Sequence, residues 1–116
     1  MSFLYVALGG ALGSMARYAV SLAAISLLGT AYPWGTLAVN ILGSAAIGAL
    51  AGMGLGGPAR LFCITGILGG FTTFSAFSLE VVMLWERNHA LAAIYLAASL
   101  VLSFAAFAAA WNLARV

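Results

Sequence analysis

The most informative stretch of this sequence reads Gly69-Gly70-Phe71-Thr72-Thr73-Phe74-Ser75-Ala76-Phe77-Ser78. It lies in the middle of an apolar segment, residues 61–85, where a continuous membrane helix would be expected. Adjacent glycines and adjacent β-branched threonines are poor helix formers, so we predict that the third helix is broken between Gly69 and Thr73. In hydrocarbon such a break frees backbone groups that must be paired by protein, water or a bound ion. The predicted break therefore marks the functional centre.

The composition is that of a helical membrane protein. Of 116 residues, 66% are hydrophobic and 5% are charged, whereas about a quarter are charged in soluble domains. The apolar runs are continuous, without the alternation of membrane β-barrels. The first run lacks the basic residues and cleavage site of a signal peptide. The net charge of +2 is too small and too dispersed to indicate nucleic-acid binding.

Punctuation by glycine, proline and polar residues divides the chain into four spans of roughly the length that crosses a bilayer. They are residues 3–28, 34–53, 61–85 and 91–113, within a single transmembrane domain of residues 1–116. We expect an all-α, multi-pass protein of the cell (inner or plasma) membrane, embedded in the lipid bilayer, with both termini on one side. The single cysteine, Cys63, is expected to be a small buried hydrophobe.

The arginines give only a weak instruction for orientation. Arg60 and Arg115 fall on the terminal side and Arg87 on the other, a difference of one positive side chain. Such a chain can insert both ways and pair as an antiparallel, dual-topology homodimer. Four short helices can hardly enclose a polar path alone, which also favours an oligomer.

The first span contains small residues and one charge. Gly9 and Gly13 are four residues apart, a spacing that lets helices pack closely. Arg17 follows one turn later, and an arginine inside a span is costly to insert. It is expected to face a wet cavity, a vestibule or a partner carbonyl, or to extend to the interface.

Two further spans carry polar residues at four-residue spacing, which places them on one helix face. The second span has Thr36, Asn40, Ser44, Gly48 and Gly52, and the fourth has Tyr95, Ser99 and Ser103. Each stripe is either a packing seam or one wall of a polar pathway. Glu80, beyond Phe77, is either solvated at the interface or marks a pore mouth.

The chemistry of these side chains favours transport of a small anion over catalysis. Hydroxyls and the Asn40 amide donate hydrogen bonds, and the edges of phenyl rings such as Phe74 and Phe77 are electropositive. Carbonyl oxygens freed by the predicted break suit a hard cation such as Na⁺. The spans have no nucleophile–base pair, phosphate loop or paired carboxylates, so we expect no enzyme.

Three stretches together carry a resemblance to a known family. They are residues 9–18 (GGALGSMARY), 34–43 (WGTLAVNILG) and 69–80 (GGFTTFSAFSLE). In these stretches the chain resembles the Fluc (CrcB-type) fluoride channels, small four-span proteins that form antiparallel dimers with two pores. The resemblance covers essentially the whole chain and implies passive, fluoride-selective export from the cytoplasm, and so fluoride resistance.

The resemblance also implies roles for particular residues. The fluoride pore would be lined by Asn40, Phe74, Phe77, Thr36, Ser75, Tyr95, Ser99 and Ser103. Carbonyl oxygens of Gly69 and Thr72 from both subunits would hold a structural Na⁺ at the dimer interface, and Arg17 would lie toward the vestibule. Ala76 stands where many relatives have threonine, which removes one hydroxyl from the polar track.

Two other readings stay open on the residues alone. A small multidrug-resistance-type, proton-coupled exporter is also short and able to insert both ways, but it needs a membrane-embedded carboxylate, usually in the first span. The first span here has Arg17 instead. A structural subunit that conducts nothing is the third reading, and the two polar stripes and the predicted break count against it.

Overall fold

The computed structural model describes residues 1–115, and the regular structure of that part is helical throughout. Four helices are long and apolar enough to cross a membrane: Ser2–Leu28, Trp34–Gly52, Gly57–Arg87 and His89–Ala114. They fall at the four positions that the sequence predicted. The protein is therefore a multi-pass membrane protein.

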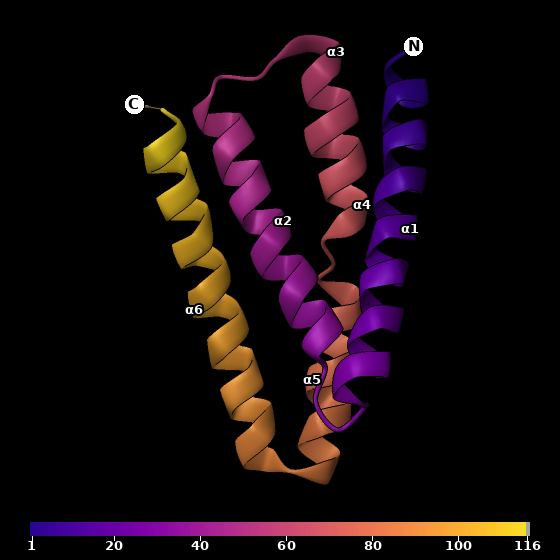
Figure 1. The fold of residues 1–116 in the computed structure, drawn as a ribbon, viewed down its shortest axis with the longest axis vertical. Coiled ribbons are helices and arrows are strands. Elements are labelled where there is room, and N and C mark those ends of the chain that lie inside the picture. The colour runs from indigo at the N-terminus through magenta and orange to yellow at the C-terminus, as the bar shows by residue number, and fades with distance from the viewer. Residues whose placement is uncertain (116) are drawn as a thin grey trace.

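Three of the spans are single helices, and the four spans pack as two pairs. They are α1 (Ser2–Leu28), α2 (Trp34–Gly52) and α6 (His89–Ala114). The α2 helix packs along α6, while α1 lies against the third span (Figure 1). The N-terminus and the C-terminal end of α6 lie at the same end of the molecule, and the turn from α5 to α6 lies at the opposite end (Figure 1).

The third span is a succession of segments. These are α3 (Gly57–Arg60), the π-helical η1 (Leu61–Leu68), α4 (Gly69–Phe71) and α5 (Ser75–Arg87). Between α4 and α5, Thr72 has extended backbone angles of φ −83° and ψ 156°. Gly69 and Gly70 are themselves helical, so the residues outside the helical segments are Thr72, Thr73 and Phe74.

The glycines of the third span serve close packing against α1. A Cβ atom added to Gly66 would lie 2.9 Å from the Cα of Gly9, and one added to Gly70 would lie 2.7 Å from the carbonyl oxygen of Gly10. Both distances are shorter than van der Waals contact, so larger residues would push the helices apart. The packing role predicted for Gly9 and Gly13 is confirmed, because both are buried against this span.

The best-buried side chains gather where α2, α5 and α6 meet. This cluster consists of Leu37, Phe77, Leu84, Ala92 and Tyr95. Tyr95 is 0% exposed and Phe77 is 4% exposed. Two residues predicted for the pore therefore also belong to the core that joins α5 to α6.

The glycine packing makes a matched pair of substitutions informative. Gly13→Ala would place a methyl group against the carbonyl oxygen of Ile67 and 2.9 Å from the Phe71 nitrogen, whereas a Cβ on Gly10 would meet nothing within 4 Å. We expect Gly13→Ala to lower the free energy of unfolding by about 1–3 kcal/mol. Gly10→Ala should be neutral or stabilising, since alanine is the better helix former. Thermal unfolding in detergent checks this, and equal melting temperatures for the two variants would contradict it.

Candidate functional site

One cavity, here called the Asn40 cavity, lies between α2, the α4–α5 junction and α6. Its volume is about 640 Å³. Its lining comprises Asn40, Ser44, Gly69, Thr72, Thr73, Phe74, Phe77, Ser99, Leu100, Ser103, Phe104 and Phe107. No lysine or arginine is among them, and the polar groups of this largely apolar lining are hydroxyls, one amide and backbone.

The Asn40 side chain pairs with both backbone groups of Thr73. Its Nδ2 donates to the Thr73 carbonyl oxygen at 3.1 Å, and its Oδ1 accepts from the Thr73 N–H at 3.0 Å. A neighbouring strand would pair a residue in the same way, and here a side chain does so because Thr73 lies outside the helices. The two bonds fix the orientation of the amide, and within residues 1–115 the second hydrogen on Nδ2 has no acceptor.

The two threonines complete the helices on either side of them. The Thr72 hydroxyl donates to the Leu68 carbonyl oxygen at 2.9 Å. The Thr73 hydroxyl oxygen accepts from the Ala76 N–H at 3.1 Å, which caps the start of α5. Backbone groups near the junction are thus paired by side chains of the junction itself and by Asn40.

Two serine hydroxyls on α6 lack partners. Within residues 1–115, the buried Oγ atoms of Ser99 and Ser103 have no hydrogen-bond partner. Buried polar groups are nearly always paired, so an unpaired one indicates a water or an ion that binds there. Both serines line the Asn40 cavity.

The phenyl rings are placed differently from each other. The rings of Phe74 and Phe77 lie 5.8 Å apart at an interplanar angle of 56°. Phe77 is buried and packs edge-on against Tyr95 at 5.2 Å. Phe74 also lines the Asn40 cavity, but it is 74% exposed.

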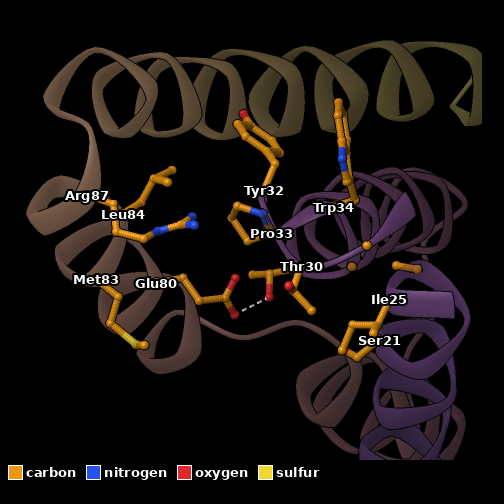
Figure 2. Close-up of a pocket in the computed structure, with 14 residues that line it drawn as sticks. Ser21, Ile25, Thr30, Tyr32, Pro33, Trp34, Glu80, Met83, Leu84 and Arg87 are labelled. Carbon is orange, nitrogen blue, oxygen red and sulfur yellow. Dashed lines mark hydrogen bonds between the residues drawn. The ribbon is translucent and has the colours of Figure 1, made fainter. Parts of the chain in front are cut away.

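A second cavity, here called the Glu80 cavity, is lined by residues of the α1–α2 connection and of α5 (Figure 2). The α1–α2 connection lies at the end of the bundle opposite the chain termini (Figure 1). Its volume is about 540 Å³. The Thr36 hydroxyl donates to the Glu80 carboxylate at 2.6 Å, and the Tyr95 hydroxyl lies 3.4 Å from its other oxygen. Tyr32 lies in the α1–α2 connection beside this cavity, and burial raises the pKa of its phenol.

The Glu80 contacts were missed by sequence reasoning, which left Glu80 at the interface or at a pore mouth. Thr36 and Glu80 are 44 residues apart, and no local pattern joins them. Thr36 lies four residues before Asn40 and Glu80 lies seven residues after Thr73, so both lie toward the same end of the bundle from the Asn40–Thr73 pair. A single sequence does not show that these two helix faces meet, so no sequence signal identified the contact.

The predicted site residues thus fall into four groups. The Asn40 cavity is lined by Asn40, Gly69, Thr72, Phe74, Phe77, Ser99 and Ser103, and the Glu80 cavity by Thr36 and Glu80. Tyr95 is buried between the two cavities and reaches Glu80. Ser75 is exposed and Arg17 is half-buried, and neither lines a cavity. The Arg17 Nε instead donates to the Gly70 carbonyl oxygen at 3.1 Å, one of the alternatives that its position in the span predicted.

The Asn40 bonds generate a stability prediction. Asn40→Ala would leave the N–H and carbonyl of Thr73 unpaired, at a cost of about 1–3 kcal/mol for each group. We expect a lower melting temperature and faster hydrogen exchange at the Thr73 amide. Ser44→Ala, one turn away on the same face, is the control and should change neither. Unchanged exchange at Thr73 in Asn40→Ala would show that the amide does not hold this backbone.

Comparison with known proteins places the chain in a family. The family model for "CrcB-like protein, Camphor Resistance (CrcB)" matches residues 4–111. A "Fluoride-specific ion channel FluC" of Rhizobium etli is 54% identical over 107 residues, which cover 87% of this chain and 86% of that protein. Proteins of the same name from Agrobacterium fabrum and Granulibacter bethesdensis are 51% and 50% identical, over 95% and 99% of this chain and 93% and 95% of theirs. The chain therefore belongs to the CrcB-like protein family.

Proposed function

We propose that this protein is a fluoride-selective ion channel that lets F⁻ leave the cytoplasm passively. The observation that carries the proposal is the convergence of unpaired donors in one cavity. Ser99 and Ser103 bring hydroxyls without a partner within residues 1–115, and the Asn40 Nδ2, which donates to the Thr73 carbonyl oxygen, carries a second hydrogen. The names of the relatives, which are ion channels and not enzymes, support the same function.

Selectivity for fluoride follows from the kind of donors present. A small anion of high charge density gains most from hydroxyl and amide hydrogen bonds, because it replaces a tightly held water shell. The ring edges of Phe74 and Phe77 add electropositive hydrogens without a fixed charge. Binding is then strong enough for the ion to enter and weak enough for it to leave.

Passage requires a second copy in this proposal. Phe74 is 74% exposed beside the Asn40 cavity, and a partner chain would complete that wall. We propose an antiparallel homodimer with two pores, each using Asn40, Phe74, Phe77, Ser99 and Ser103 of one chain. Thr36, Ser75 and Tyr95 would continue the polar track toward the membrane faces, and Arg17 would lie toward the vestibule.

A structural Na⁺ at the dimer interface is part of the proposal. Within residues 1–115, no hydrogen bond reaches the carbonyl oxygens of Gly69 and Thr72, and both residues border the Asn40 cavity. Unpaired carbonyl oxygens are the ligands that a hard cation prefers, so these residues fit the ion. Two carbonyls are too few for a complete shell, and the partner chain would supply the same two. The bound charge would make the surroundings more favourable for an anion.

One observation favours the second candidate, a proton-coupled exporter of the small multidrug-resistance type. Glu80 is a carboxylate within a span, half-buried and bordering a cavity. Its Oε1 already accepts the Thr36 hydroxyl at 2.6 Å, and the family match is to CrcB-like proteins. The exporter would require uptake of a cationic substrate that depends on a proton gradient, and this separates the two functions.

The first functional prediction concerns the ion. Purified protein in liposomes should release internal fluoride down its gradient, while chloride efflux stays at the level of protein-free vesicles. The reason is the donor set of the Asn40 cavity, which lacks lysine and arginine. Ion-selective electrodes measure both effluxes. Equal fluoride and chloride rates would refute the selectivity, and no efflux of either would refute the channel.

The second functional prediction concerns the phenyl rings of Phe74 and Phe77. Phe74→Ile and Phe77→Ile each remove the ring hydrogens proposed to face the ion, so each should cut fluoride efflux by about tenfold. Phe77→Ile should also lower the melting temperature, because Phe77 is 4% exposed, whereas Phe74→Ile should not destabilise the monomer fold. Phe3→Ile, on the 92% exposed Phe3 of α1, is the control. Wild-type efflux in both pore variants would remove the rings from the mechanism.

A further inference from the structure

The Glu80 cavity contains one basic side chain, Arg87, in the last turn of α5. The side chain is exposed, and Figure 2 shows its guanidinium turned into the cavity near Leu84 and Pro33. No other lysine, arginine or histidine lines this cavity. An arginine placed at the rim of a cavity raises the local concentration of anions there.

The guanidinium is held in place but keeps most of its donors. One Nη nitrogen donates to the Ala31 carbonyl oxygen at 2.7 Å, which ties the end of α5 to the α1–α2 connection. A guanidinium carries five N–H donors, so several remain for a ligand. Within residues 1–115, Arg87 makes no hydrogen bond to a carboxylate, so its charge is not neutralised by a direct contact.

The position of Arg87 relative to Glu80 indicates what the charge of Arg87 does. The two are seven residues apart on α5, about two helical turns, and both line the cavity. The Glu80 carboxylate repels an anion that comes through this cavity, and the Thr36 hydroxyl at 2.6 Å reduces that repulsion only locally. A cation at the rim offsets it along the approach to Glu80.

We propose that Arg87 is the anion-receiving group of the channel at the mouth of the Glu80 cavity. It concentrates fluoride there and passes it toward Thr36 and Tyr95. The inference rests on the proposed function, and it assigns to the cavity a transient anion site that includes the guanidinium. The hydrogen bond to the Ala31 carbonyl oxygen positions the guanidinium charge of Arg87.

The test measures fluoride efflux from vesicles of zwitterionic lipid at low fluoride, with ionic strength set by impermeant salt. The Debye length is about 30 Å at 0.01 M and about 10 Å at 0.1 M, so attraction by Arg87 should be strong at low salt and screened at high salt. Arg87→Gln keeps an amide donor but removes the charge, and it should lower the rate at about 0.01 M by about tenfold. The gap to wild type should close at high salt.

Two further variants separate the effect of the Arg87 charge from the effect of its hydrogen bond to Ala31. Arg87→Lys keeps the charge without the planar fork, and it should retain most of the wild-type rate and its salt dependence. Arg60→Gln removes the same charge from an exposed residue at the end of α3, which lies at the opposite end of the molecule from the α5–α6 turn (Figure 1). It should have little effect on the rate of fluoride efflux. Melting temperatures in detergent establish that each variant is folded.

Three results would overturn the inference: a wild-type rate in Arg87→Gln at low salt, an equal loss in Arg60→Gln, or a loss in Arg87→Lys as large as in Arg87→Gln. If Arg87→Gln does not fold, wild-type protein decides, because its rate must fall as salt rises and a flat profile contradicts the proposal. Absence of any fluoride efflux from wild type would instead refute the proposed channel itself.

Discussion

The pairing of the Asn40 amide with the backbone of Thr73 is the interaction on which the site depends. In a bilayer each backbone N–H and carbonyl must find a partner within the protein, and residues outside a helix lose theirs. Asn40 replaces both partners of Thr73 at 3.1 and 3.0 Å. The chain can then leave helical geometry at Thr72–Phe74 with both backbone groups of Thr73 paired, and Phe74, Phe77 and the threonines border one cavity.

Close packing by glycine holds the other side of this junction. The α1 helix approaches η1 and α4 so closely that a Cβ on Gly66 or Gly70 would overlap its backbone. Arg17 adds a bond to the Gly70 carbonyl oxygen at 3.1 Å, just before the chain leaves the helix. The polar group of Arg17 therefore serves the backbone of α4, and in the proposed dimer it also contributes positive charge near the vestibule. One side chain thus links the first span to the functional centre.

Sequence reasoning reached the features that depend on local patterns. The four spans follow from runs of apolar residues, and the shared face of Asn40 and Ser44, like that of Ser99 and Ser103, follows from four-residue spacing. Contacts between spans depend on which sides of the helices pack together, and a single sequence does not contain that information. The bond from Thr36 to Glu80 and the exposure of Ser75 were therefore out of reach. The glycines at 69 and 70 were read as helix breakers, although their backbone is helical and packs near α1.

In the proposed channel the two cavities would divide the work of ion passage. The Asn40 cavity offers neutral donors, and the Glu80 cavity, toward one end of the bundle, holds the Glu80 carboxylate and the Arg87 guanidinium. The rings of Phe77 and Tyr95, whose centroids are 5.2 Å apart, lie between the two cavities. In that channel, an ion that moves between the cavities would pass the edges of these rings. Fluoride is small enough to exploit such edges, and this physical match connects the geometry to the function.

The most direct test is an NMR titration that follows the Asn40 side-chain amide in ¹⁵N-labelled protein in detergent or nanodiscs. If the Asn40 cavity binds fluoride, the free amide hydrogen should shift strongly downfield as fluoride is added, and equal chloride should leave it in place. The shift should saturate, as expected for a defined site. An amide chemical shift that does not change when fluoride is added, or one that changes equally with chloride, would contradict the account.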